Sequence, residues 1–167
     1  IQGIAAGDYQ LGTVQSDVMA YAWEGTRSFE TEGKVDSFRT VAGLYAEAVQ
    51  LVTMDPEIKS VADLAGKSVS IGAPGSGVYF NAVDVLTAAG LTEEDINAQY
   101  QSFADSADAL KDGKIDAAFI VAGPPTPAIT ELCTTNDAYL VPIDGEIADK
   151  LMEASPFYTS HVIPAGT

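Results

Sequence analysis

The sequence predicts an α/β fold with a mostly parallel sheet. Three observations indicate this class. Short apolar runs alternate along the chain with stretches of helical character, as in successive βαβ units. One run, residues 115–121, is almost continuously apolar, which is typical of a strand covered on both faces. Hydrophobic residues make up 47% of the 167-residue chain, enough for a substantial core.

The first elements are indicated by apolar runs and by capping residues. Residues 11–14 are expected to form a strand, and Ser16-Asp17 to begin a helix that extends to about residue 23. After a polar loop, residues 41–54 contain a strand rich in valine and leucine, which an Asp-Pro pair ends. Residues 60–67 form a capped turn that closes on glycine, and residues 68–72 form the next strand.

The middle of the chain continues the alternation. Residues 78–89 are expected to form a helix, which Gly90 closes. Residues 98–103 favour a strand and residues 104–110 a helix, which ends at an Asp-Gly pair.

The last part of the chain repeats the strand and helix pattern. The apolar run at residues 115–121 is followed by a proline-rich loop and a helix to about residue 134. A further strand is expected at residues 139–143 and a helix at residues 145–154.

The charge balance excludes whole classes of partner. The chain has 24 acidic against 8 basic residues, a net charge of −16. Nucleic acids and anionic membranes are therefore not expected as partners. A small anion remains possible where backbone N–H groups provide the local positive potential.

Histidine and cysteine are too few for most catalytic and metal sites. Cys133 and His161 are the only residues of their types, so no intrachain disulfide, metal cluster or catalytic triad is expected. No cofactor is predicted. Cys133 is expected to be a small buried apolar side chain in a helix-like stretch.

The strongest local motif is a glycine-rich turn between a strand and a helix. Its residues Gly75, Ser76, Gly77 and Val78 would direct free N–H groups at one point, where a carboxylate or phosphate would fit. A tight connection with a serine cap is the alternative. The loop is neither a P-loop, because no lysine follows Gly77, nor a dinucleotide fingerprint, because Phe80 stands where the third glycine belongs.

Two further segments follow expected strands and are candidates for the same edge of a sheet. Gln15 and Ser16 are suited to orienting a polar ligand, and Asp17 either accepts from an amine or only caps the helix. Gly123 and Pro124 form a rigid stretch that suits a pocket wall or a plain connection equally well.

Tyr45 and Glu47 are placed two residues apart in an expected strand. Residues at this spacing share one face of a strand, so both side chains would look into a cleft or into solvent at the strand's end.

These segments, in this order, resemble the TAXI family of TRAP-transporter solute receptors. The resemblance extends over the whole chain and is carried by the stretches 11–18 (LGTVQSDV), 44–50 (LYAEAVQ), 58–67 (IKSVADLAGK), 72–77 (GAPGSG), 110–119 (LKDGKIDAAF), 156–158 (PFY) and 162–167 (VIPAGT). The family usually has threonine or serine after Pro-Gly-Ser-Gly, where this chain has Val78 and so lacks one hydroxyl donor.

The resemblance implies a periplasmic-binding-protein fold of type II, with two α/β lobes that close on a ligand. It implies that lobe one is incomplete here, with residues 1–55 part of lobe one and residues 56–167 mostly lobe two. It places Gln15, Ser16 and Asp17 at the cleft, with Tyr45 and Glu47 near it. Residues 75–78 would capture a carboxylate, and Gly123-Pro124 would lie on the facing wall.

The sequence is accordingly interpreted as a non-enzymatic receptor of the bacterial periplasm. By resemblance, it binds a small anionic solute such as glutamate, glutamine or a dicarboxylate and delivers it to the membrane permease of a TRAP transporter. One alternative is an α/β enzyme that acts on a phosphorylated small molecule through the loop from Gly75 to Gly77. Another is a receptor for a two-component sensor or an ABC-like system, which uses the same fold.

Overall fold

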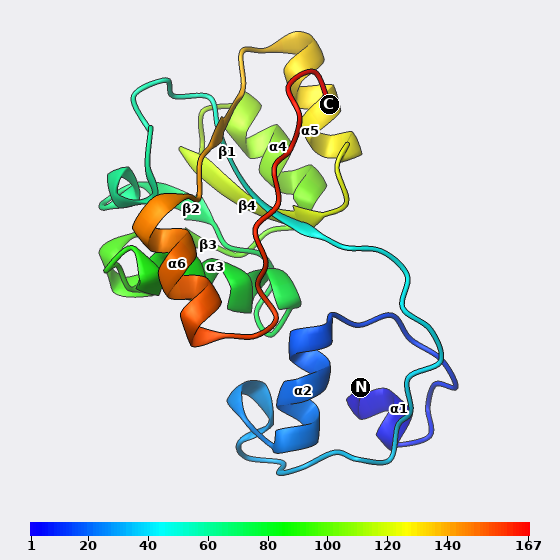
Figure 1. The fold of residues 1–167 in the computed structure, drawn as a ribbon. Helices are drawn as coiled ribbons and strands as arrows, with labels where there is room; N and C mark the ends of the chain where they lie inside the picture. Colours follow the sequence, from blue (N-terminus) through cyan, green and yellow to red (C-terminus); the bar gives the residue numbers. More distant parts are fainter. The chain divides into compact units, whose positions relative to one another are not determined.

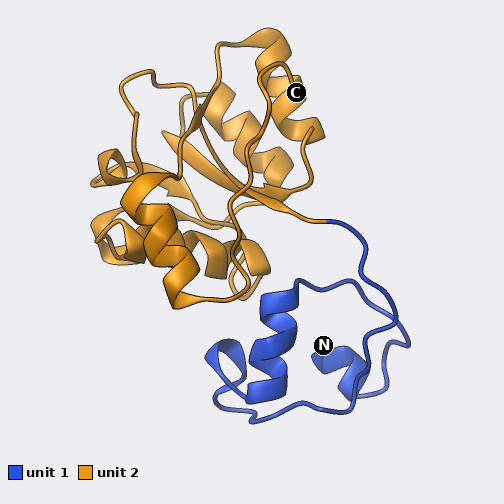
Figure 2. Cartoon of the chain, in the orientation of Figure 1, with its two compact units in different colours: residues 1–45 blue, residues 46–167 orange.

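The computed structural model describes residues 1–167 and divides the chain into two compact units. The first unit is Ile1–Tyr45 and the second is Ala46–Thr167 (Figure 2). These units are defined by compactness, and the lobe boundary expected after residue 55 stays a prediction. Residues 48–53 form a strand that pairs with two other strands of the second unit.

The first unit is helical and contains no strand. Its elements are α1 (Gln2–Ala5), α2 (Ser16–Glu24) and the 3-10 helix η1 (Arg27–Phe29). The strand expected at residues 11–14 is wrong: this segment is irregular, and Leu11 and Val14 are exposed. A strand requires a partner for its backbone N–H and C=O groups, and the unit offers none.

Helix α2 starts and ends as the sequence indicates. Gly25 follows it with φ +72°, a left-handed conformation that favours glycine. A Cβ atom at Gly25 would meet the backbone nitrogen of Lys34 at 2.9 Å, so the returning loop also requires a residue without a side chain there.

The second unit has five strands, four helices and two 3-10 helices (Figure 1). The elements in chain order are β1 (Ala48–Thr53), η2 (Val61–Leu64), β2 (Ser68–Ser70), α3 (Gly77–Ala88), η3 (Glu93–Asp95), β3 (Asn97–Gln99), α4 (Phe103–Lys111), β4 (Ala117–Ala122), α5 (Pro127–Thr135), β5 (Tyr139–Val141) and α6 (Gly145–Ala154). Every strand and helix expected after residue 41 is present, in several cases shorter than expected.

The five strands form one sheet in the order β3-β2-β4-β1-β5. Strand β2 is parallel to both β3 and β4, while β1 is antiparallel to both β4 and β5. Four strands therefore run in one direction and β1 alone runs against them, which confirms the α/β class with a mostly parallel sheet. The chain leaves β2 for β3 on one side and returns to β4 on the other, so β2 is the point where the strand order reverses.

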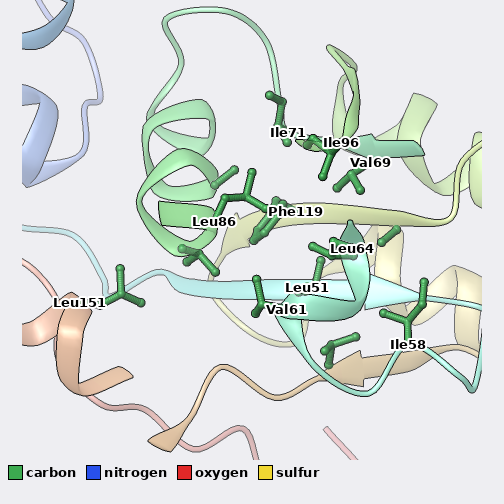
Figure 3. Close-up of a cluster of buried hydrophobic side chains, with 14 residues drawn as sticks. Leu51, Ile58, Val61, Leu64, Val69, Ile71, Leu86, Ile96, Phe119 and Leu151 are labelled. Atoms are coloured by element: carbon green, nitrogen blue, oxygen red, sulfur yellow. The ribbon is translucent and has the colours of Figure 1, made fainter. Parts of the chain in front are cut away.

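Helices cover both faces of this sheet (Figure 1). Helices α3 and α6 pack over one face, where their side chains join Leu51, Val69 and Phe119 in the larger core cluster (Figure 3). On the other face, α4 and α5 pack against Val52 and Ile120. Adjacent residues of β1 point to opposite clusters, as the alternation of side chains along a strand requires.

Short polar motifs cap the N-terminal ends of the 3-10 helices η2 and η3. Ser60 and Asp63 form a capping box at η2, and Thr92 and Asp95 form another at η3. The sequence indicated the first of these turns. No helix of the structure combines the length and the apolar character that crossing a membrane requires.

Candidate functional site

The carboxyl edge of the sheet gathers several of the segments that the sequence predicted to bind a ligand. The strands β2, β3, β4 and β5 all end at this edge, and β1 begins there, since Ala48 pairs with Ala122 at the end of β4. Ligands of open α/β sheets bind outside this edge, next to the strand where the order reverses. That strand is β2, and the glycine-rich loop follows it directly.

The glycine-rich loop ends in a serine-capped helix. The Oγ atom of Ser76 accepts a hydrogen bond from the backbone N–H of Tyr79 at 3.2 Å, which leaves its own hydroxyl hydrogen available to donate. Gly75 is exposed and Gly77 is half-buried in the first turn of α3. The N–H groups that begin this helix have no carbonyl partner within it, and the helix dipole adds partial positive charge. The start of α3 therefore offers backbone and hydroxyl donors together.

Gly72 is the residue that allows the loop to turn so tightly. Its φ is +80°, and a Cβ atom there would lie 2.9 Å from both Cβ and Cγ1 of Val78. Val78 is half-buried against this glycine. In this sequence, the position that follows Pro-Gly-Ser-Gly thus packs the loop and offers no hydroxyl to a ligand.

Two more helices begin at the same edge. Helix α4 is capped by Ser102, whose Oγ accepts from the backbone N–H of Asp105 at 3.2 Å. Helix α5 begins at Pro127 after Thr126, whose side chain does not cap it. Gly123 and Pro124 are half-buried in the loop between β4 and α5, and the Pro124-Pro125 peptide is cis.

The lysines of the second unit form ion pairs away from the carboxyl edge of the sheet. Lys67 precedes β2 and pairs with Asp55 at 3.6 Å, and Lys111 ends α4 and pairs with Glu131 at 3.4 Å. The other three lysines of the unit also pair with nearby carboxylates. Since none of them comes from a loop at the carboxyl ends of the strands, positive potential there comes from helix N-termini.

Tyr45 and Glu47 do not lie in a strand, so their expected position on a common strand face is wrong. Strand β1 begins only at Ala48, where pairing with β4 begins. Both side chains are exposed, Tyr45 with 71% of its surface. Glu47 directly precedes β1 and so stands at the carboxyl edge, where its carboxylate suits a hydrogen-bond donor of a ligand.

Gln15, Ser16 and Asp17 begin helix α2 in the first unit, but no strand precedes them, so the expected sheet edge is absent there. Gln15 occupies the N-cap position with extended backbone angles, and Ser16 is the first helical residue. Asp17 is only 5% exposed, and its Oδ1 accepts from the backbone N–H of Val18 at 2.7 Å. Asp17 therefore serves the start of the helix.

Sequence reasoning missed a cluster of two tyrosines and one glutamate beside the loop. The hydroxyl of Tyr79 donates to Glu93 Oε2 at 2.9 Å, and the hydroxyl of Tyr100 donates to Glu93 Oε1. These hydrogen bonds to the carboxylate raise the pKa of both tyrosines. The position of each tyrosine, one after the loop and one after β3, was the available signal.

Gln101 is a second residue that sequence reasoning missed. It lies between β3 and α4, and its Oε1 is buried without a hydrogen-bond partner. An unpaired buried acceptor is costly, so this carbonyl is suited to a donor that a ligand would bring. No group of three or more His, Cys, Asp or Glu side chains is gathered to hold a metal ion.

The comparisons with known proteins agree with this architecture. A model of the NMT1-like family matches residues 1–167. The structure of a periplasmic sulfonate-binding protein SsuA from Methylobacillus flagellatus KT superimposes with a TM-score of 0.54 over 84% of this chain and 38% of that chain, at 19% identity. This match shows that the chain has the periplasmic-binding-protein fold.

A second solved structure covers less of the chain. The periplasmic aliphatic sulphonate binding protein SsuA from Escherichia coli is 31% identical over 57% of this chain and 31% of that one, with a TM-score of 0.48. The chain thus spans about a third of the length of these two proteins. Both are named as periplasmic sulfonate-binding proteins.

Proposed function

The chain belongs to the NMT1-like family, and we propose that it is the solute-binding part of an extracytoplasmic receptor that supplies a membrane transporter. The observation that carries this proposal is the exposed glycine-rich loop at the carboxyl edge of the sheet, where the N-terminus of α3 is open to an anion. The absence of lysine and arginine from that edge makes backbone and hydroxyl capture the means of binding.

The proposed solute is a small organic anion that also carries a hydrogen-bond donor. Glutamate, glutamine or a dicarboxylate satisfies the loop from Gly75 to Val78 through a carboxylate. The buried, unpaired carbonyl of Gln101 and the carboxylate of Glu47 favour an ammonium or amide group on the same solute. The similar structure from Methylobacillus flagellatus KT is that of a sulfonate-binding protein, so a sulfonate belongs among the candidates.

The proposed mechanism is closure of two lobes. The first unit, with Gln15, Ser16, Asp17 and Tyr45, would contribute to lobe one, and the second unit, with Gly123-Pro124 as a wall, would form most of lobe two. A solute that bridges both lobes favours the closed state through its higher affinity for that state. The closed receptor would then dock on the permease of a TRAP transporter in the periplasm.

A pair of substitutions at Gly75 tests the anion site. Asparagine and aspartate have nearly the same size, and both tolerate the positive φ of +74° found there. Aspartate alone adds a negative charge beside the helix N-terminus. At about 4 Å its repulsion of a bound anion is about 1–4 kcal/mol, so the affinity should fall about fivefold or more relative to asparagine.

The affinities of both variants are measured by isothermal titration calorimetry with glutamate, glutamine, succinate, methanesulfonate and a sugar phosphate. Equal affinities of the two variants for every bound anion would show that this loop is not the site. Turnover of the sugar phosphate would favour the alternative of an enzyme that acts on phosphorylated molecules.

A further inference from the structure

A hollow of about 190 Å³ lies on the α5 side of the sheet. Its floor is formed by Gln50 of β1 and Thr126 before α5, and its walls include Pro124, Ile129 and Leu140. A water molecule takes up about 30 Å³ of liquid, so the hollow has room for about six non-hydrogen atoms.

The hollow is a different place from the anion site. Gln50 belongs to the side of β1 that also carries Val52, and Val52 packs with α4 and α5. The glycine-rich loop leads into α3, which covers the opposite face with Leu51 and Phe119. A ligand in the hollow therefore contacts none of the loop residues 75–78, although Pro124 lines the hollow and also belongs to the wall expected for the anion site.

The lining of the hollow favours an uncharged ligand. None of the side chains that line it carries a charge, and Pro124, Pro125, Ile129, Leu140 and Ile163 give it apolar walls. An isolated ion without a partner would be strongly disfavoured in such a lining.

The floor offers one polar function, a hydrogen-bond acceptor. Gln50 and Thr126 are 4% and 5% exposed. The Nε2 atom of Gln50 donates to Thr126 Oγ1 at 3.0 Å and to the carbonyl of Ala122 at 3.2 Å. Its Oε1 receives only a long bond of 3.4 Å from the Thr126 hydroxyl, so the carboxamide oxygen retains acceptor capacity.

The other hydroxyls around the hollow already donate to backbone carbonyls. Thr130 Oγ1 donates to the carbonyl of Thr126 at 3.2 Å, and Thr134 Oγ1 donates to the carbonyl of Glu131 at 2.7 Å. We propose that the hollow is a second binding site, for a small neutral molecule with a short hydrocarbon part and an N–H or O–H donor directed at Gln50 Oε1.

Cys133 provides a reporter for this site. It is the only cysteine of the chain, it is exposed, and it lines the hollow. The experiment follows the rate at which Cys133 in the full chain reacts with a disulfide reagent, with and without butyramide. Butyramide has six non-hydrogen atoms, about as many as the hollow accommodates.

Two matched compounds serve as controls. 2-Pentanone has a methyl group in place of the amide NH2, so it keeps about six non-hydrogen atoms without the N–H donor, and butyrate replaces the neutral amide by a charge. Butyramide should slow the labelling saturably, about threefold at twice its Kd by mass action, and neither control should do so. Equal protection by all three compounds, or no protection by butyramide up to its solubility limit, would overturn the proposal.

A variant locates the acceptor. Gln50→Met retains the length of the side chain and removes its oxygen, and it should abolish the protection by butyramide while a far-UV circular dichroism spectrum verifies the fold. If this variant fails to fold, methyl NMR of the wild-type chain decides instead. Butyramide should then shift the signals of Ile129 and Ile163, and unmoved signals would refute the site.

Discussion

Replacing Gly72 by alanine should destabilise the second unit by about 2–4 kcal/mol. Gly72 has φ +80°, a backbone conformation that costs an L-residue about 1–2 kcal/mol. The new Cβ would also lie 2.9 Å from Cβ and Cγ1 of Val78 and 3.2 Å from Ser76 Oγ. Overpacking of this kind costs about 1–3 kcal/mol. The lower entropy of the unfolded alanine chain offsets less than about 1 kcal/mol of the sum.

Gly75→Ala is the matched control for the steric part. Gly75 has φ +74°, almost the same conformation, but no heavy atom lies within 4 Å of the position that the alanine methyl group would take. This variant should lose only the conformational cost, about 1 kcal/mol after the entropic offset. The measurement is urea unfolding of both variants, followed by circular dichroism.

A double variant tests the steric explanation further. In Gly72→Ala with Val78→Ala, the close contact with Val78 Cγ1 is gone while the contact with Cβ remains, so part of the strain is relieved and the two substitutions should be less harmful together than the sum of their separate effects. Additive effects, or equal losses in Gly72→Ala and Gly75→Ala, would refute the assignment of the loss to the contact with Val78.

Three other outcomes are expected. Ser106→Ala should cost about 1–3 kcal/mol in urea unfolding, because it leaves the buried Ser70 hydroxyl without its 2.8 Å partner, whereas Ser70→Ala with Ser106→Ala should cost less than that single change. Phe119→Ala should cost about 3–5 kcal/mol, since the ring is 1% exposed in the larger core cluster, and a loss below about 1 kcal/mol would contradict this packing. The hydrogen bonds from the Thr92 backbone and hydroxyl lower the pKa of Asp95 below 3.8, so the stability that this group contributes is present above that pH and is lost as the pH falls through its lowered value. Asp95→Asn should therefore flatten the acid limb of the stability profile, and an unchanged limb would speak against the capping role.

The elements of the second unit were predictable because local signals agree with the fold there. Helix α3 was expected at residues 78–89 and runs over Gly77–Ala88, since a glycine-rich turn precedes it and Gly90 follows it. The apolar run that predicted β4 is buried because the strand lies between two neighbours under helices on both faces.

The first unit was less predictable because some of its apolar residues follow one another as they would in a strand. Residues 11–14 have a strand-like composition, but no strand lies beside them. Tyr45 and Glu47 likewise precede β1, whose first residue is set by the pairing of Ala48 with Ala122. The composition of a segment indicates only its tendency to form a strand. A strand also needs hydrogen-bond partners from the backbone of another segment.

The sequence by itself determined the α/β class and the glycine-rich turn at residues 75–77, because turns, caps and apolar periodicity are local properties. Only the tertiary structure decided which distant side chains meet. Gln50 bonds Thr126 across 76 positions, and Tyr79 and Tyr100 share Glu93. The order of the strands brings these groups together. That order follows from burying both faces of one sheet at once, a requirement that cannot be deduced from any single segment.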